Sequence, residues 1–541
     1  MRTKLGSSNS PWNPINGDFK PLTQDRSVDV CIIGAGIAGI SCAYQLNRRG
    51  RSVIVLDAGE IAGGETGRTT AHLTAAIDDR YVEIERMHGV QGARLSAESH
   101  TQAIDTIEGI VREENIACEF ARVDGYLFNP PGEDSKNLRQ ECKAASRAGL
   151  LGVEIVSRAP WAGFDTGPAL RFPNQAQFNP TKYLQGLVDR LSSRGVQFFT
   201  HTRVKEVRGG SPASALTVNG KKILAGAVIV ATNTPFNDWV VIHTKQAAYR
   251  TYAIAAPIPA NTLPQALYWD TANPYHYVRL QPHPAREGEE LLIVGGEDHK
   301  TGQEDDPKSR YRVLEEWSRR RFPEMGAVEY RWSGQVMEPV DGVAFIGPNP
   351  TEDSANVYIV TGDSGQGMTH GTIAGILLAS LIQGRPHPWL NLYDPARKSL
   401  RSLGRFLKEN LNVALTYTEW LSGGDVDSVE EIPPGEGAIC RHGLSKIAVY
   451  RDPAGKYFSC SAACPHLGAV LSWNSAEKTW DCPAHGSRFD PYGRVLHGPA
   501  ERNLSAVHWD FKKGNEDEKD TTSSSSSDSR REHSLGGRFD H

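Results

Sequence analysis

One stretch, Val28–Asp57, constrains the fold of this 541-residue chain more than any other. An apolar, β-branched run over residues 28–33 enters the glycine-rich segment 34–39, and a helix-like pattern follows. Residues 52–56 then form a second apolar run that ends at an aspartate. Buried parallel strands on either side of a helix give this order of residues. The sequence therefore predicts an α/β unit near its start.

The three glycines of this segment suit a dinucleotide-binding turn. Gly34 allows the tight turn, Gly36 lets the backbone approach a pyrophosphate, and Gly39 permits close packing of helix on strand. The helix N-terminus offers free N–H groups and about half a positive charge to phosphates, and Asp57 is placed to bind a ribose. A glycine-rich helix start without a ligand is the alternative, but strand, glycines, helix and acid stand in register. The expected contacts are Gly34, Gly36, Ile37, Ala38, Gly39, Asp57 and Ala58.

A second signature lies near the other end of the chain. Two of the eight cysteines stand in metal-site spacing, in Cys464-Pro-His466 and in Cys482-Pro-Ala-His485. Short alternating runs around them, broken by Gly, Pro and Asp, predict a small all-β domain. A tetrahedral zinc site with two Cys and two His is one reading. However, zinc fingers commonly pair the cysteines first and the histidines second, whereas each loop here supplies one of each.

This ligand order resembles the Rieske pattern, which implies a [2Fe-2S] cluster with two cysteines on one iron and two histidines on the other. The flanks are similar too, including the loop Gly498-Pro499-Ala500. Rieske domains of the cytochrome bc and b6f complexes have a disulfide where this chain has Ala469 and Ala484. They have a tyrosine where it has Phe489, while Ser487 remains as a donor. Fewer hydrogen bonds to sulfur imply a potential in the lower half of the roughly −150 to +300 mV Rieske range.

Three further segments resemble the D-amino-acid oxidase/glycine oxidase superfamily, over about residues 28–397. Residues 226–233 look like its far-side strand, residues 356–368 like its C-terminal flavin signature, and residues 63–70 like its loop against the isoalloxazine ring. The resemblance implies FAD. We expect it to be held non-covalently, because Arg68 falls near the position of the histidine to which dimethylglycine dehydrogenases attach FAD. His72, four residues later, is a remote alternative for covalent attachment. The resemblance adds as cofactor contacts Gly64, Arg68, Thr69, Val204, Ala231, Gly365, Gln366, Gly367 and Met368.

The fold class that follows is an α/β FAD-binding module (Rossmann-like, glutathione-reductase-type) with an inserted antiparallel β-sheet for the substrate, and then a small all-β Rieske domain. We expect a flexible N-terminal arm at residues 1–26 and the oxidoreductase at 27–421, with its substrate sheet mainly within 234–347. A linker at 422–437, the Rieske domain at 438–511 and a disordered, serine-rich tail at 512–541 complete the chain.

The catalytic residues are not determined by the sequence. Residues 275–279 alternate as a strand, so Tyr277 and Arg279 would share a face and could orient a substrate carboxylate. A structural role for both is an equally good interpretation. His299 and Gln366 are further candidates with no better case.

The leading hypothesis is an FAD-dependent amine or amino-acid dehydrogenase that passes electrons singly to its own cluster and then to an external acceptor. The alternatives are an amine oxidase that uses O₂ directly, and a non-enzymatic electron-transfer or redox-sensing adaptor that docks a partner through an exposed Rieske tip. A second dinucleotide motif for NAD(P) was not found. The net charge of −5 gives no reason to expect nucleic acid, and no apolar run approaches the roughly 18 residues of a membrane span, so we expect a cytoplasmic protein.

Overall fold

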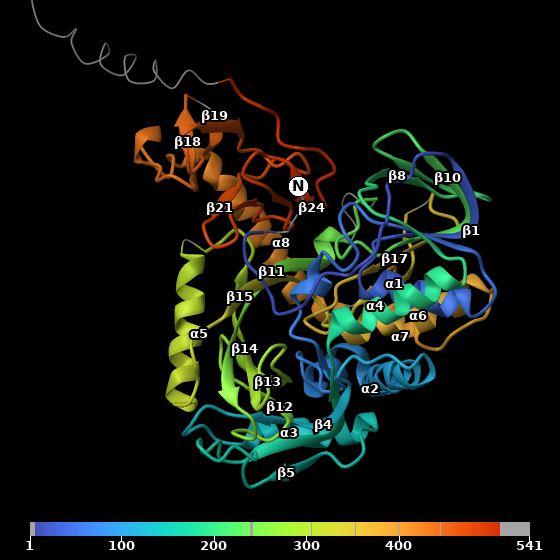
Figure 1. The fold of residues 1–541 in the computed structure, drawn as a ribbon, viewed down its shortest axis with the longest axis vertical. Coiled ribbons are helices and arrows are strands. Elements are labelled where there is room, and N and C mark those ends of the chain that lie inside the picture. The colour runs from blue at the N-terminus through green and yellow to red at the C-terminus, as the bar shows by residue number, and fades with distance from the viewer. Residues whose placement is uncertain are drawn as a thin grey trace, which may run out of the picture.

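The computed structural model describes residues 6–237, 242–304, 306–351, 353–398, 400–443 and 445–508. The predicted disordered tail lies outside these residues. A large module of two sheets and their helices forms most of the molecule, and a small β domain stands against one end of it (Figure 1).

The first sheet contains the predicted α/β unit. Within the described residues its strand order is β16-β17-β10-β1-β2-β7, and β1 runs parallel to both β10 and β2. Helices α1 and α6 can pack closely because Gly371 and Gly375 of α6 have no side chain. An added Cβ at these positions would lie 3.0 and 2.8 Å from the α1 backbone. The strands and helices are β1 (Arg26–Ile33), β2 (Val53–Leu56), β7 (Gln197–Phe199), β8 (Val204–Arg208), β9 (Ala213–Thr217), β10 (Lys222–Val230), β16 (Phe345–Pro348), β17 (Val357–Thr361), α1 (Ile37–Asn47), α4 (Pro180–Ser193), α6 (Gly367–Ile382) and α7 (Leu390–Tyr393).

The second sheet is broader than predicted. It has the order β15-β11-β14-β13-β12-β4-β6-β3, with β5 beside β6. Strands β11–β15 lie within the predicted range 234–347, and β3–β6 lie outside it. The prediction of an antiparallel sheet is wrong at one place, because β4 pairs in parallel with β12. Its elements are β3 (His72–Leu73), β4 (Ala121–Phe128), β5 (Glu154–Val156), β6 (Ala169–Gln177), β11 (Gln246–Pro259), β12 (Ala266–Asp270), β13 (His276–Pro282), β14 (Glu289–Lys300) and β15 (Tyr330–Pro339), flanked by α2 (Tyr81–Glu113), α3 (Lys136–Ala148) and α5 (Pro307–Arg321).

The N-terminal segment is not a free arm where the structure describes it. Trp12 and Leu22 are buried. The indole Nε1 of Trp12 donates to the carbonyl of Thr69 at 2.6 Å, and the backbone N–H of Leu22 donates to Thr202 Oγ1 at 2.9 Å. The segment is polar on average, but burial of the apolar side chains of Trp12 and Leu22 stabilises its contact with the large module.

The small domain also begins earlier than predicted. It consists of two sheets. The first contains β18 (Glu436–His442), β19 (Ser445–Arg451) and β20 (Tyr457–Ser461), and the second contains β21 (Ser472–Asn474), β22 (Thr479–Asp481), β23 (Arg488–Phe489) and β24 (Val495–His497). Val429 and Ile432 of the predicted linker are buried against Ala438 and Cys440. The connector is therefore part of the domain core.

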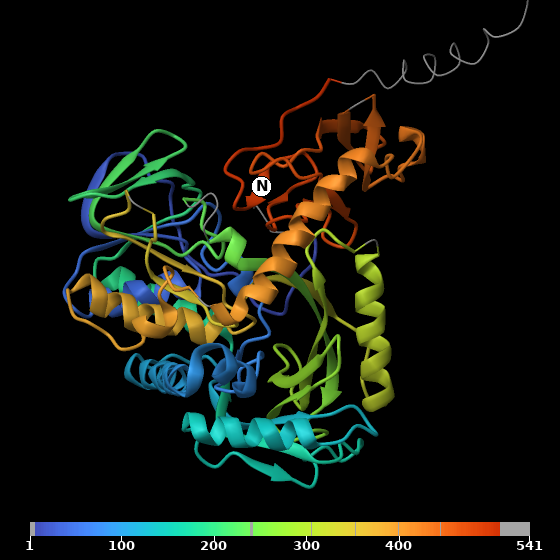
Figure 2. The same cartoon turned by 180° about the vertical axis from the view of Figure 1, so that it is seen from behind.

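Helix α8 (Leu403–Thr416) joins the two parts of the molecule (Figure 2). At the large module, Asn410 Nδ2 donates to the carbonyl of Thr244 at 3.0 Å. A 3-10 turn, Tyr417–Leu421, follows α8. The hydroxyl of Tyr417 donates to the carbonyl of Leu467 at 2.8 Å, and Leu467 is the residue after the predicted cluster ligand His466. Helix α8 and the turn after it therefore connect the large module to a loop that carries a predicted cluster ligand.

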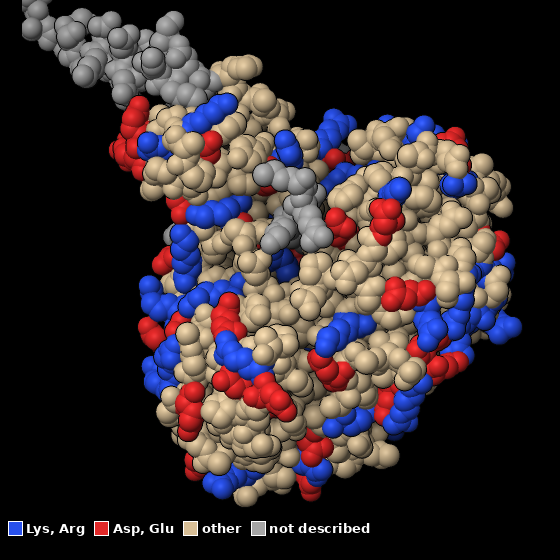
Figure 3. Space-filling model, viewed as in Figure 1, with Lys and Arg blue, Asp and Glu red and all other residues tan. Residues whose placement is uncertain are grey.

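The outer surface carries both signs of charge. On the face drawn in Figure 3, Lys and Arg are interspersed with Asp and Glu, and neither sign forms a continuous field. Among the helices of the described residues, none combines the length and apolar character that a bilayer span requires.

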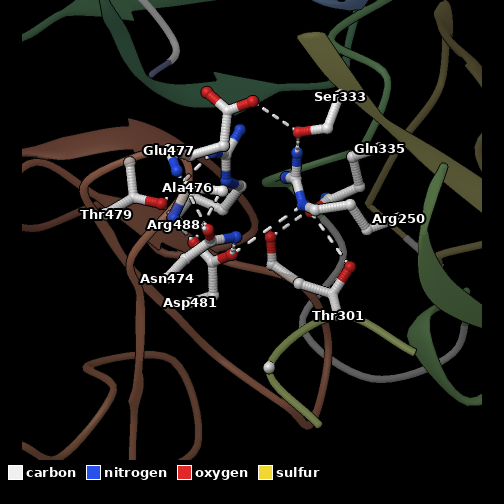
Figure 4. Close-up of polar contacts among 12 residues, drawn as sticks. Arg250, Thr301, Ser333, Gln335, Asn474, Ala476, Glu477, Thr479, Asp481 and Arg488 are labelled. Atoms are coloured by element: carbon white, nitrogen blue, oxygen red, sulfur yellow. Dashed lines mark hydrogen bonds and ion pairs between the residues drawn. The ribbon is translucent and has the colours of Figure 1, made fainter. Parts of the chain in front are cut away.

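Five charged side chains link the small domain to the large module, and we call them the interdomain ion network: Arg68, Arg250, Glu477, Asp481 and Arg488. Figure 4 labels the last four of them. Arg68 Nη1 lies 3.1 Å from Glu477 Oε1, Arg488 Nε lies 3.1 Å from Asp481 Oδ1, and Arg250 Nε lies 3.8 Å from Asp481 Oδ2. All five side chains are at most 8% exposed. Burial alone would raise the pKa of Glu477, but the guanidinium groups of Arg68, Arg488 and Arg250 lower it to about 2.

Removing one carboxylate from the interdomain ion network should cost much stability. We expect Glu477→Ala to lower the free energy of unfolding by about 3–5 kcal/mol, because it leaves the buried guanidinium of Arg68 without its counter-charge. Urea denaturation measures this change. Because the folded pKa is depressed, the contribution is present above the ordinary glutamate pKa and is lost as the pH falls through about 2.

The exposed carboxylate of Glu287 provides a matched control. Glu287→Ala should change the free energy of unfolding by no more than about 0.5 kcal/mol. A loss in Glu477→Ala that is as small as in this control would show that the network does not hold the domains together.

Candidate cofactor and substrate site

A deep cavity opens at the carboxyl ends of the parallel strands, between the two sheets. Every predicted FAD contact except Gly39 lines it: Gly34, Gly36, Ile37, Ala38, Asp57, Ala58, Gly64, Arg68, Thr69, Val204, Ala231, Gly365, Gln366, Gly367 and Met368. Gly39 has a packing role instead, since an added Cβ would lie 1.9 Å from the carbonyl oxygen of Gly34. That each lining residue touches FAD stays a prediction, which this arrangement supports.

The walls of the cavity suit a dinucleotide. Helices α1 and α6 both begin at it, and neither N-cap side chain accepts a hydrogen bond from its helix. The N–H of Ile37, the first residue of α1, donates to Thr66 Oγ1 at 3.0 Å, and the positive ends of the two helix dipoles face the space where an anionic ligand would bind. Asp57 accepts the N–H groups of Ala35 and Gly59, each at 2.7 Å, which fixes the turn after β2. Burial raises the pKa of this carboxyl.

Tyr277 and Arg279 have different environments. Tyr277 lines the cavity, and its hydroxyl lies 3.1 Å from Thr251 Oγ1. Arg279 is fully buried and donates to the carbonyls of Thr70, Ala71 and Phe178 at 2.8–3.1 Å. The prediction that Arg279 could orient a substrate is wrong. Its guanidinium donates to backbone carbonyls of loops that are distant in sequence, and Arg279 does not line the cavity. Its role is structural.

The other candidates also separate. Gln366 lies in the cavity wall, whereas His299 is outside the lining and its ring Nε2 lies 2.9 Å from the hydroxyl of Tyr252. His72 lines the cavity, with Nδ1 3.1 Å from Thr70 Oγ1. Burial and the charge of Arg279 lower the pKa of His72 to about 3, so this ring is neutral near pH 7.

The predicted cluster ligands converge in the small domain. Cys464 and Cys482 are buried, and the rings of His466 and His485 lie 5.0 Å apart between centroids. The two loops have matching turns, in which Gly468 N–H donates to the carbonyl of Cys464 at 2.8 Å and Gly486 N–H donates to that of Cys482 at 3.0 Å. Ser487 Oγ accepts the N–H of Ala500, which ties down the proline loop.

The donor set fits a two-iron cluster better than a single ion. In the part of the chain that the structure describes, no three His, Cys, Asp or Glu side chains converge on one metal position. A tetrahedral zinc site needs four donors around one point, whereas a Rieske cluster divides its four ligands between two irons. His485 Nδ1 is buried without a hydrogen-bond partner, as a nitrogen reserved for a metal would be.

The histidine ligands face the large module. The ring of His243, from the 3-10 turn His243–Lys245, lies 5.2 Å from that of His466 and 5.9 Å from that of His485. His466 and His485 are 7% and 6% exposed. The alternative of an adaptor that docks a partner through exposed cluster histidines does not fit this burial.

The cavity and the cluster loops share a wall. Leu496, His497, Gly498, Ala500 and Glu501 of the small domain line the same cavity as the predicted FAD contacts. Gln335 of β15 lies between them: its Nε2 donates to the carbonyl of Gly486 at 3.0 Å and to His497 Nδ1 at 3.1 Å. No motif marks Gln335, His497 or His243, so only the tertiary structure reveals their positions.

The comparisons with known proteins agree with both predicted modules. The profile of the family described as FAD dependent oxidoreductase matches residues 29–381, and the Rieske [2Fe-2S] domain profile matches residues 423–508. The Rieske 2Fe-2S iron-sulfur protein YhfW of Bacillus subtilis is 32% identical over 495 residues, which cover 91% of this chain and 96% of that protein.

Other similarities cover the large module. Gamma-glutamylputrescine oxidoreductase of Escherichia coli is 24% identical over 381 residues, covering 68% of this chain and 86% of that protein. The crystal structure of glycine oxidase from Geobacillus kaustophilus superposes with a TM-score of 0.58 at 17% identity, covering 69% of this chain and 99% of that one. At this identity the structural likeness concerns the fold alone.

Removing a cluster ligand should abolish iron binding without loss of flavin. We expect His485→Ala to lower the iron content from about two atoms per chain to near zero, because each iron depends on its pair of protein ligands. Metal analysis and the visible spectrum of the purified protein measure this. Cys460→Ser is the control, since Cys460 is a buried cysteine of the same domain outside the predicted ligand set. Full iron content in His485→Ala would refute the ligand assignment.

Proposed function

Because the chain belongs to the FAD dependent oxidoreductase family and carries a Rieske [2Fe-2S] domain, we propose that it oxidises a C–N bond of an amine or amino-acid-like substrate and passes the electrons singly to its own cluster. An external one-electron acceptor then takes them from the cluster. The protein binds FAD and a [2Fe-2S] cluster.

The observation that carries the proposal is the shared wall between the cavity and the small domain. The segment Leu496–Glu501 and the side chain of Gln335 belong to the flavin cavity, and Gln335 also holds the carbonyl of Gly486, next to the predicted ligand His485. His243 packs against both predicted histidine ligands. A flavin in the cavity and a cluster on the predicted ligands would therefore be bound on two sides of the same wall.

The chemistry balances for a dehydrogenase. The substrate loses a hydride, which is one proton with two electrons, from the carbon next to nitrogen, and its C–N bond becomes C=N. Water then hydrolyses this bond to a carbonyl and a free amine. The bound flavin supplies an acceptor of two electrons, and the cluster carries one electron at a time, so each substrate requires two passages through the cluster. The chain itself orients the substrate and encloses it.

The name of one relative supports a C–N substrate. Gamma-glutamylputrescine oxidoreductase matches the large module of this chain. Its name refers to a nitrogen compound. The family membership therefore favours a donor in which the oxidised carbon carries an amino group.

An anaerobic screen tests the proposal. Amines, N-methyl amines, amino acids and imines are mixed with the protein, and bleaching of the flavin and of the cluster is followed by absorbance and electron paramagnetic resonance. We expect at least one amine-containing compound to bleach both centres, with the cluster following the flavin. If no such compound reduces the flavin, the proposal fails. If the flavin is reduced but the cluster never bleaches, direct reaction with O₂ is the better description.

The variant His485→Ala separates the two halves of the relay. Its flavin should still be bleached by the same substrate, because no cluster ligand lines the cavity. Reduction of an external one-electron acceptor such as a cytochrome should fall by at least about tenfold, which corresponds to about 1.4 kcal/mol in the barrier. Cys460→Ser is again the control, and an unchanged rate in His485→Ala would contradict electron passage through the cluster.

A further inference from the structure

The inner end of the flavin cavity has aromatic and acidic walls. Tyr275, Tyr277 and Trp269 form the aromatic part, and the rings of Tyr275 and Tyr277 lie 5.6 Å apart between centroids. A second cavity adjoins this end and shares Asp78, Trp269 and Tyr275 with it. The shared residues therefore stand at the junction of the flavin cavity with this second cavity, which we call the outer cavity.

Asp78 is the charged group at this junction. Gln366 Nε2 donates to its Oδ1 at 3.3 Å, and an added Cβ on Gly365 would lie 2.4 Å from its Oδ2. The carboxylate thus lies against the loop that begins α6, in the wall predicted to hold the flavin ring. Burial raises the pKa of Asp78 to about 6, so the group is mostly ionised at neutral pH.

Further carboxylates stand behind the aromatic wall. Asp298 neighbours Tyr275 and Thr251, and its Oδ1 is buried without a hydrogen-bond partner. Asp79 and Glu338 both accept a hydrogen bond from Ser364 Oγ, at 2.8 and 2.7 Å. Burial raises the pKa of Asp298 to about 7 and that of Glu338 well above its ordinary value, so Asp78 is more fully ionised at neutral pH than either of them.

The cations around the cavity are directed elsewhere. Two arginines are among its described lining residues. The Arg68 guanidinium pairs with Glu477, and Arg203 Nη2 donates to the carbonyl of Val495 at 3.1 Å, at the side of the cavity where Asp57 lies. Arg80 lines the outer cavity only. The charge of Arg80 favours the ionised form of Asp78 from there. A carboxylate on the α-carbon of an amino acid would therefore find the two arginines of the flavin cavity engaged elsewhere and Arg80 acting on Asp78 itself.

We propose that this site selects a cationic amine without an α-carboxylate, whose ammonium group is bound by Asp78 and by the ring faces of Tyr275 and Tyr277. Aromatic faces and a carboxylate both attract ammonium ions, and both gain strength in an enclosed site. On the outer face drawn in Figure 3 the charges are mixed, so selection by charge falls to the lining of the cavity. The inference rests on the proposed amine-oxidising function and narrows its substrate class.

Two isosteric probes test the selection. The probes are tert-butylammonium and 2-aminoisobutyrate, which has a carboxylate in place of one methyl group of the former. Neither carries a hydrogen on the carbon next to nitrogen. Binding can therefore be measured without turnover, by isothermal titration calorimetry on the holoprotein. We expect tert-butylammonium to bind at least about tenfold more tightly, a difference that one well-placed charge contact can supply. Equal or tighter binding of 2-aminoisobutyrate, or binding of neither probe, would overturn the inference.

The substitution Asp78→Asn identifies the residue responsible. It keeps an acceptor for Gln366 and removes only the charge, and a buried carboxyl with a raised pKa does not stabilise the fold when ionised. We expect the preference for tert-butylammonium to fall to about twofold or less, which corresponds to the loss of most of the charge contact. Asp189→Asn, an exposed carboxylate of α4, should leave the preference unchanged. A preference that survives in Asp78→Asn would refute the role of Asp78.

The anaerobic screen distinguishes this inference from the function on which it rests. Flavin bleaching by amino acids, with none by simple amines, would leave C–N oxidation standing and refute the selection. Bleaching by neither class would refute both.

Discussion

The interdomain ion network is the contact on which the geometry of both redox sites depends. Two carboxylates of the small domain, Glu477 and Asp481, meet arginines of both domains in a region closed to water. Taking such charges out of water is costly unless each finds its counter-charge, so the network tolerates few relative positions of the domains. One consequence is that the segment Leu496–Glu501 lies over the cavity of the large module.

The cavity is composite for the same reason. Its glycine-rich floor comes from the first sheet, its aromatic end from the second sheet, and part of its roof from the small domain. Gln335 and His243 belong to the large module, yet they contact the cluster loops and the predicted cluster histidines. The cluster side of the small domain therefore faces inward, toward the flavin cavity, and a bound substrate is enclosed by parts of the chain that are far apart in sequence.

The sequence predicted those features that local spacing encodes. Three glycines after a buried strand can form only a few kinds of turn, and the predicted neighbours of that turn line one cavity. Residues 226–230, part of the segment that resembles the far-side strand of the superfamily, lie in β10, which pairs in parallel with β1. Predictions that relied on composition or on a single periodicity were poorer: the polar N-terminal segment packs through Trp12, and Arg279 donates to backbone carbonyls instead of facing the cavity.

By itself the sequence determined the two cofactors and the residue types that hold them, because a phosphate-binding turn and a cluster loop are short backbone structures fixed by neighbouring residues. Only the tertiary structure decided which side chains stand between the cavity and the predicted cluster loops, and which charges line the cavity. Gln335 approaches Gly486, and Asp78 approaches Gly365, across long stretches of chain. Such contacts depend on how the two sheets and the small domain pack, and no local pattern of residues specifies that packing.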